Sequence, residues 1–343
     1  MHASGKYTLL FILLMIGTIA LFILNISLGS VSIPLKEVFK SLTGGTSSKE
    51  TWQYIIINYR LPKAITAVLA GAGLSVSGLL MQTLFRNPLA GPYVLGLSSG
   101  SSLGVAFVIL GASLVQGFFG SILLSQYGIM VASCGGSLLV LAAVLVVSQR
   151  LRDTMAILIV GLMFGSFTSA IVGVLSYFST AEQLQKFTFW TLGNLGNLSW
   201  NSVAILAVAV FAGLCLSIIS IKPLNALLLG ENYAKSLGLN YSKAKLVIIF
   251  ATSILAGSIT AFAGPIAFVG LAVPHIAKLA FRTSDHRVLF WATLLFGAMI
   301  MLLCDIAAQV PGTDITLPIN AITSIIGAPV VVWLMLKKRK MTL

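Results

Sequence analysis

The chain has 343 residues, of which 58% are hydrophobic and only 8% are charged, and its formal net charge is +13. An ordinary soluble domain carries roughly 25% charged residues, so this composition excludes a water-soluble globule and indicates an integral membrane protein. The apolar residues form continuous blocks of about 17 to 25, which favours spanning helices over a membrane β-barrel. The positive charge is concentrated on one side of the predicted membrane spans, as shown below, so it indicates the orientation of the protein in the membrane and not a nucleic-acid partner.

Sequence motifs for catalysis are missing. The sequence contains no G-x-x-x-x-G-K-[ST] phosphate-binding loop, no H-E-x-x-H and no G-x-S-x-G. We therefore predict no catalytic residue and no nucleotide site in this chain. The cysteines lie inside apolar blocks without paired spacing, so we predict neither a disulfide nor a metal site. The scattered histidines are His2, His275 and His286, and the cysteines are Cys134, Cys215 and Cys304.

Ten apolar stretches predict an all-α membrane protein with about ten transmembrane helices in a single domain, 1–343. The first stretch is longer than the 7–15 residues of a signal-peptide core and lacks a cleavage site, so we expect a retained helix. The eighth is short and contains Pro274. The predicted spans are 8–28, 60–85, 94–110, 129–147, 155–178, 203–219, 246–262, 266–280, 288–310 and 315–336.

A short surface helix is predicted between the first two spans. It starts at Ser32-Ile33-Pro34, with a capping Ser and a Pro in the first turn, and it stops at Gly44-Gly45. Polar residues then continue to Tyr59. One face of the surface helix carries Leu35, Val38, Phe39 and Leu42.

Small residues recur every four positions in two of the predicted spans. The second span has Ala67, Gly71 and Ser75, a spacing that lets membrane helices approach closely. The third span starts with a Gly- and Ser-rich segment, which we expect to face protein or a watery path. For the fifth span, helix packing is favoured over a pore wall, and both interpretations stay open. The residues assigned to the translocation path or to helix packing are Ser98, Ser99, Gly161, Gly165, Ser169 and Gly173.

The distribution of Lys and Arg predicts the orientation. With ten spans both termini lie on one side, and fifteen of the 21 basic residues fall there. By the positive-inside rule we expect that side, and both termini, to be cytoplasmic. The six basic residues on the other side are Lys36, Lys40, Lys49, Arg60, Lys63 and Lys186.

The longest polar interval in the second half of the chain is 221–245, between two predicted spans. Its pattern predicts two short amphipathic helices on the cytoplasmic side. Pro223 opens the first, and Gly238 closes the second as a C-cap. Such a segment is either a docking surface for another protein or a loop on the lipid surface. The predicted apolar stripes are Leu224, Leu227 and Leu228 in the first helix, and Tyr233, Ala234 and Leu237 in the second.

Asp305 is the one acidic residue inside a predicted span, near its outer end. An intramembrane acid is a candidate functional residue, although a lone one near an interface is more often a structural hydrogen-bonding group. The lack of an ionisable relay argues against proton coupling. Sodium coupling through carbonyls and hydroxyls stays open.

An ordered series of short motifs runs along both halves of the sequence. The first half contains Arg60-Leu61-Pro62, 70–74, Gln82, Arg86-Asn87-Pro88-Leu89-Ala90 and Leu95-Gly96. The second half contains Trp190, 193–195, Leu229-Gly230-Glu231, Ala234, Leu237-Gly238, Gly264-Pro265 through Gly270-Leu271, Pro274-His275-Ile276, 285–287, Asp305 and 327–329. In these motifs, over about residues 28 to 336, the sequence resembles the FecCD/BtuC-type permease family of the iron-siderophore, haem and vitamin B12 ABC importers.

The resemblance implies a type II ABC importer permease in the bacterial cytoplasmic membrane. It implies ten helices per subunit, a second permease subunit (an identical copy or a paralogue), two copies of a separate ATPase and an extracytoplasmic binding protein. ATP and Mg would be bound by the ATPase, and this chain would hold no cofactor. Arg60 and Lys63 would receive acidic side chains of the binding protein. The coupling helices, at about 222–240, would contact the ATPase through Leu229, Gly230, Glu231, Tyr233, Ala234, Leu237 and Gly238.

The expected cargo is an iron complex, most commonly a ferric siderophore in this family, with haem and cobalamin as alternatives. An ion-coupled secondary transporter with inverted repeats is the alternative function. The sequence departs from the family pattern around the predicted docking site. The departures are Lys63 and Gln309 for Arg, Thr316 for Glu, Asn320 for Gly and Gly91 for Asp.

Overall fold

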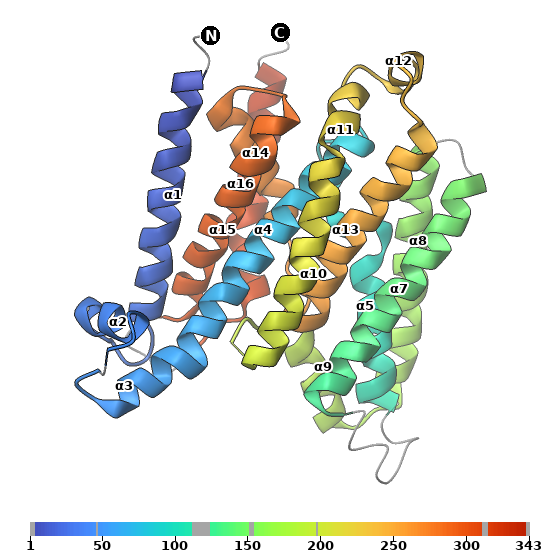
Figure 1. Ribbon diagram of the computed structural model, residues 1–343. Coiled ribbons are helices and arrows are strands. Elements are labelled where there is room, and N and C mark those ends of the chain that lie inside the picture. Colours follow the sequence, from blue (N-terminus) through green and yellow to red (C-terminus); the bar gives the residue numbers. More distant parts are fainter. Residues whose placement is uncertain are drawn as a thin grey trace. The chain divides into compact units, whose positions relative to one another are not determined.

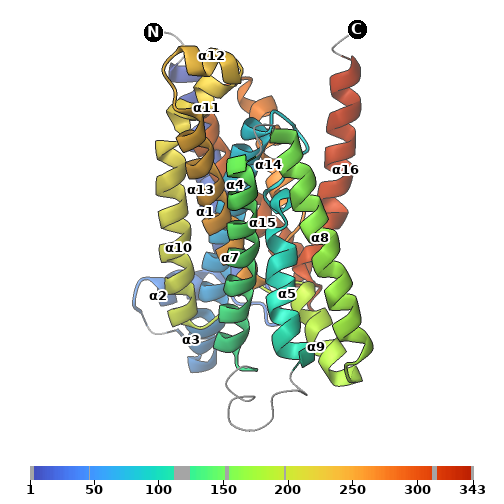
Figure 2. The ribbon, with the colours of Figure 1, turned by 90° about the vertical axis from the view of Figure 1, so that its right-hand side faces the viewer.

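The computed structural model describes residues 4–45, 47–111, 124–150, 154–196, 198–310 and 315–340, and every regular element in these ranges is helical (Figures 1 and 2). Seven of the described helical stretches are long and apolar enough to cross a membrane, and three shorter apolar helices bring the number to the ten predicted. The long helices are α1 (Ser4–Ser27), α4 (Leu61–Leu84), α7 (Gln126–Arg150), α8 (Thr154–Tyr177), α10 (Trp200–Ile219), α13 (Tyr241–Ala263) and α15 (His286–Ala308). The shorter ones are α5 (Leu97–Ile109), α14 (Val269–Phe281) and α16 (Ile319–Lys340).

Short helices connect the spans. The predicted surface helix is present as α2 (Leu35–Leu42), but its predicted start is corrected: Pro34 is the N-cap residue, and no side chain caps the helix. The second span was predicted to start at Arg60, but the helical stretch starts earlier, because α3 (Glu50–Ile55) and a π-helix, η1 (Ile56–Arg60), continue directly into α4. Helix α9 (Ala181–Thr191) was not predicted, although its capping box is visible in the sequence as Thr180 followed by Gln183. The remaining short helices are η2 (Pro92–Leu95), α11 (Ile221–Leu227) and α12 (Glu231–Ser236).

The chain folds into two compact units that alternate along the sequence. Unit 1 comprises Met1–Leu79, Asn194–Val208 and Ile266–Leu343, and unit 2 comprises Leu80–Gly193 and Ala209–Pro265. The assignment of 1–343 to a single domain stays a prediction. Arg152, which contributes to the predicted charge asymmetry, lies outside the described residues.

In unit 1, glycines set the closest helix approaches. A Cβ on Gly71 of α4 would overlap the carbonyl oxygen of Gly297 on α15, and a Cβ on Gly297 would overlap that of Gly71. The small-residue spacing predicted for the second span therefore does bring two helices together. At one end of the unit, Phe281 of α14 packs with Leu14 and Leu289. The start of α1 and the end of α16 lie at the same end of this unit (Figure 1).

In unit 2, α5 and α7 pack through a second glycine contact. A Cβ on Gly100 would lie 2.5 Å from the carbonyl oxygen of Gly136, and a Cβ on Gly104 would overlap that of Ala132. At the end of α5, Val105 and Ile109 are buried in a cluster that includes Trp190 of α9. The Gly- and Ser-rich segment, expected to face protein or a watery path, therefore packs on a neighbouring helix.

Candidate functional site

The predicted pair of short helices in 221–245 is present in unit 2 as α11 and α12 (Figure 1). Gly230 separates them with φ 106°, a conformation that favours glycine. The prediction that Gly238 closes the second helix is confirmed: its φ is 85°, its amide donates to Lys235, and the Leu239 amide donates to the Ala234 carbonyl. Pro223 is the third residue of α11 and not the first.

The apolar side chains of this segment divide between two faces. Ala234 is fully buried within unit 2, whereas Tyr233 and Leu237 are 55% and 61% exposed. The prediction that Ala234 shares a partner-binding face with these two residues is therefore corrected: Ala234 holds α12 against its own unit. Leu229, which precedes the Gly230 bend, is also 61% exposed. The exposed stripe, which we call the Tyr233 stripe, consists of Leu229, Tyr233 and Leu237.

Charged groups support α12 from its own sequence and from the loop after α4. Lys235 bonds to Glu231 at 2.5 Å, an i, i+4 pair in the exposed part of the helix. The Arg86 guanidinium lies beside Gly230, 3.5 Å from where a Cβ would stand. In the same loop the side chain of Asn87 accepts from the Leu89 amide at 2.9 Å. The signature segment Arg86-Asn87-Pro88 is therefore next to the bend between α11 and α12.

The second candidate site in the structure is a polar cluster around Asp305 in unit 1. Lys63 Nζ lies 3.1 Å from Asp305 Oδ1. Asn25 Nδ2 and Gln309 Nε2 each donate to Oδ2 at 2.9 Å. The Asp305 side chain is 3% exposed and that of Lys63 is 21% exposed. One carboxylate thus joins α1, α4 and α15, which supports the structural interpretation of the lone intramembrane acid.

Arg60 lies inside the fold, with 8% of its surface exposed. Its Nη1 donates to the carbonyls of Ile26 and Ser27 at 2.8 Å, and its Nη2 donates to the carbonyl of Val31. Ile26 and Ser27 end α1, where carbonyls lack helical partners and a cation opposes the helix dipole. The prediction that Arg60 is a rim charge for a binding protein is corrected, because the guanidinium is bonded to its own backbone. Lys63 is likewise paired internally with Asp305.

The predicted small-residue stripe of α8 divides along its length. A Cβ on Gly96 would contact the carbonyl oxygen of Gly161, and a Cβ on Gly165 would contact the Ser99 hydroxyl. The first half of the α8 stripe therefore packs on α5 and its N-terminal turn. Ser169 and Gly173 are exposed, and a Cβ on Gly173 would meet nothing within 4 Å. Helix packing therefore accounts for the first half of the stripe. Ser98 and Ser99 are half-buried near this contact.

The remaining signature residues are at tight backbone contacts. Gly264, with φ 76°, ends α13 where a Cβ would lie 2.6 Å from the carbonyl oxygen of Trp190 in unit 2. Pro265 follows it. In unit 1 a Cβ on Gly78 would overlap the backbone of Gly270. Pro274 is buried inside α14, beside the half-buried His275. These residues shape helix packing and the ends of helices.

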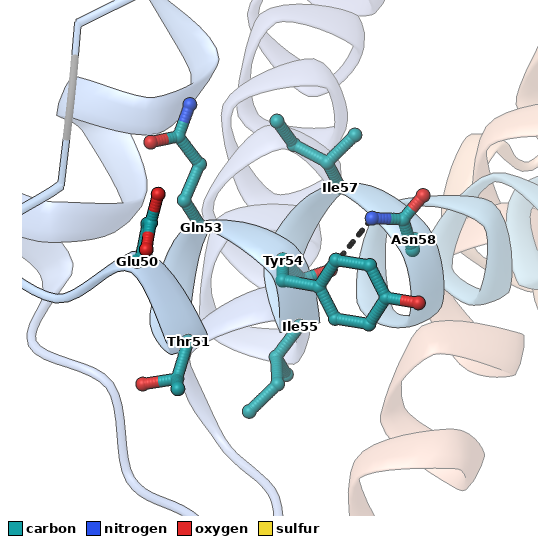
Figure 3. A pocket seen from close by; sticks show the side chains of 7 residues that line it. All are labelled: Glu50, Thr51, Gln53, Tyr54, Ile55, Ile57 and Asn58. Atoms are coloured by element: carbon teal, nitrogen blue, oxygen red, sulfur yellow. Dashed lines mark hydrogen bonds between the residues drawn. The ribbon is translucent and has the colours of Figure 1, made fainter.

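A surface hollow of about 680 Å³ lies along α3 and the π-helix η1 (Figure 3). Figure 3 shows the side chain of Asn58 turned toward Tyr54, and Asn58 Nδ2 donates to the Tyr54 carbonyl at 3.1 Å. Glu50 is the one charged residue in its lining. The hollow is open and belongs to one continuous helix, so it is a surface feature of the start of this span. Its lining residues are Glu50, Thr51, Gln53, Tyr54, Ile55, Ile57 and Asn58.

The family model of the FecCD transport family matches residues 16–337. The chain belongs to this family. The haemin transport system permease protein HmuU of Yersinia pestis is 34% identical over 328 residues, covering 95% of this chain and 96% of that protein. The vitamin B12 import system permease protein BtuC of Klebsiella pneumoniae is 36% identical over 288 residues, covering 84% of each chain.

Solved structures agree with the FecCD assignment. A structure described as an inward-facing conformation of a metal-chelate type ABC transporter matches with a TM-score of 0.83 and 28% identity, covering 96% of this chain and 99% of that one. PsaBC from Streptococcus pneumoniae in complex with Fab shares the fold, with a TM-score of 0.54 and 15% identity over 88% of this chain and 95% of that one. This FecCD-family chain is therefore a multi-pass ABC importer permease of the predicted fold class, and the family itself is not an enzyme family.

Proposed function

We propose that this FecCD-family chain is the permease subunit of an ATP-driven importer that moves an iron complex from a binding protein into the cytoplasm. The observation that carries the proposal is the match of the family model over residues 16–337. The sequence has no phosphate-binding loop, so the energy for transport would come from a separate ATPase that binds ATP and Mg. This assignment is favoured over the ion-coupled secondary transporter.

The Tyr233 stripe is the surface that we assign to the ATPase. It is exposed and apolar, while the other side of α12 is fixed by the buried Ala234. A force applied to the stripe would therefore be transmitted through Ala234 and the Gly230 bend into α11 and α13. The excess of basic residues on the side of 221–245 supports a cytoplasmic position for this segment and for both termini.

The experiment compares two adjacent exposed residues of α12, Tyr233 and Asn232. Tyr233→Asp places a charge in the proposed apolar contact and should abolish both co-purification of the ATPase and uptake. Asn232→Asp adds the same charge outside the stripe and should leave both near the wild-type level. Wild-type ATPase stoichiometry with the Tyr233→Asp variant would show that docking does not use this stripe.

The iron complex is proposed because one relative is named a haemin permease and one matching structure is described as a metal-chelate type transporter. Other relatives are named as vitamin B12 import permeases, so cobalamin is the principal competitor. Proteoliposomes that contain this chain, its ATPase and its binding protein should take up a radiolabelled ferric siderophore. Uptake of cobalamin or haemin in preference to every ferric siderophore tested would reject the siderophore assignment.

A second permease subunit, identical or paralogous, and an extracytoplasmic binding protein complete the proposed assembly in the bacterial cytoplasmic membrane. Arg60 and Lys63 are engaged within unit 1, so we do not assign them as free charges for the binding protein. Lys63 keeps 21% of its side chain exposed. Its charge would therefore reach a partner only in competition with Asp305.

A further inference from the structure

The eight residues of α2 present chemically different faces to their surroundings. Val38 and Ser41 are buried, and Val38 packs in a cluster with Ile26 at the end of α1 and Ile56 of the π-helix. The other apolar residues of α2 form an exposed stripe next to Val38, because a helix turns about 100° per residue and positions i, i+4 and i+7 share a face. We call this exposed stripe the α2 stripe; it consists of Leu35 at 48%, Phe39 at 50% and Leu42 at 39% exposure.

The polar residues of α2 occupy the rest of its circumference. Lys36 and Lys40 are exposed and lie side by side, one turn apart. Glu37 is instead turned toward the loop after the helix, where its carboxylate accepts from the Ser48 amide and the Ser47 hydroxyl at 2.8 Å. These two hydrogen bonds, with the nearby Lys40 as a smaller cause, hold the pKa of Glu37 below its usual value. The Glu37 carboxylate is therefore hydrogen-bonded to the loop, and both lysines stay exposed.

The level of α2 is set by its attachment to a spanning helix. Ser27, the last residue of α1, donates from its hydroxyl to the Ile33 carbonyl at 2.6 Å, and the Ile33 amide donates back to the Ser27 carbonyl at 3.1 Å. Arg60 joins the same carbonyl region. In Figure 1, α2 lies at the end of α1 away from the chain's start. A helix held this close to the end of a span lies at the boundary between hydrocarbon and water.

Aromatic residues near α2 in unit 1 indicate the same boundary. Tyr54 and Tyr59 are 60% and 57% exposed, and their rings lie 5.9 Å apart. Trp200, at the start of α10, donates from its ring nitrogen to the Ile57 carbonyl at 3.1 Å and is 41% exposed. Exposed Tyr and Trp are enriched where a membrane protein crosses the headgroup region.

We propose that α2 is an interfacial helix whose Leu35, Phe39 and Leu42 insert among the lipid acyl chains on the membrane side opposite the chain termini, while Lys36 and Lys40 bind anionic phospholipid headgroups. The apolar stripe and the adjacent lysines match the two layers that such a helix meets. Val38 and Arg60 couple the helix to α1 and to the helix that continues into α4. Lipid contact at α2 would therefore help hold the outer ends of these spans in place.

The test uses site-directed spin labels on the full chain in lipid vesicles, in a variant without its three native cysteines. Phe39→Cys places a label on the stripe, Leu35→Cys places a second one there, and Ser48→Cys places a control on the exposed loop after the helix. Collision rates are measured with oxygen, which concentrates in hydrocarbon, and with a water-soluble nickel chelate.

Both stripe labels should collide several-fold more with oxygen than with the nickel chelate, and Ser48→Cys should show the reverse. Adding phosphatidylglycerol to phosphatidylcholine vesicles should deepen the Phe39→Cys label, and Lys36→Gln with Lys40→Gln should remove that dependence. Nickel accessibility at both stripe positions equal to that at Ser48→Cys would overturn the proposal and leave the face open to a soluble protein. A response to phosphatidylglycerol that is unchanged in the double Gln variant would overturn the role of the lysines.

Discussion

Replacing Asp305 by Asn should lower the free energy of unfolding by about 2 to 3 kcal/mol, because it removes the anion on which Lys63, Asn25 and Gln309 converge. An Asn side chain has one oxygen, whereas the carboxylate uses one oxygen for Lys63 and the other for both Asn25 and Gln309. The NH₂ group of the new Asn side chain would point its own N–H donors at the donors that the carboxylate now accepts from. The expected cost lies below the full value for an isolated buried pair because the Lys63 side chain is 21% exposed and water would solvate part of its charge.

Equilibrium unfolding in mixed detergent micelles measures this cost, with Glu50→Gln as a control because Glu50 is an exposed carboxylate in the same unit. Lys63→Met in the Asp305→Asn background should recover part of the loss, since it removes the unpaired cation. The double-mutant cycle should give a coupling of about 1 kcal/mol or more between Lys63 and Asp305. Additive effects, or an Asp305→Asn variant as stable as Glu50→Gln, would show that the pair does not stabilise unit 1.

Three further substitutions test individual contacts by the same unfolding measurement. Gly297→Ala should lower the free energy of unfolding by at least about 2 kcal/mol, because its Cβ would overlap the Gly71 carbonyl. The control Gly173→Ala, whose Cβ would have no atom within 4 Å, should cause no loss. Equal effects of the two substitutions would contradict the close approach of α4 and α15. Arg60→Lys should cost about 2 kcal/mol because an ammonium cannot hold three carbonyls in the planar arrangement of a guanidinium, and wild-type stability would refute this anchoring role. Gly238→Ala should cost about 1 kcal/mol from its φ of 85°; no loss would mean that the end of α12 relaxes freely.

The agreement between sequence and structure is closest where the signal is local. The continuous apolar stretches gave ten spans because the hydrocarbon thickness fixes how many residues a helix needs to cross it. The Gly238 C-cap followed from a single residue type at a helix end, since few other residues adopt a positive φ. The start of the second span was misplaced by ten residues because Glu50 and the polar residues after it continue the helix above the apolar stretch.

The α12 helix illustrates the limit of periodicity. Spacing alone put Ala234 with Tyr233 and Leu237, because positions i, i+1 and i+4 fall within one broad arc of a helix. A helix of six residues is too short for its pattern to separate a face that packs inward from one that faces a partner. Burial of Ala234 within unit 2 makes that distinction, and it moves the proposed ATPase contact to Leu229, Tyr233 and Leu237.

By itself, the sequence determined that this chain is an all-helical, multi-pass membrane protein, because hydropathy and the length of apolar stretches are properties of contiguous residues. Only the tertiary structure decided what Arg60 and Lys63 do. Their partners, the end of α1 and Asp305, lie far away in sequence. The sequence pattern around a basic residue does not differ between one that contacts a binding protein and one that bonds within its own fold. The physical reason is that a charge near the membrane takes whichever oxygen atoms the folded chain brings within reach, and residue type does not reveal which these are.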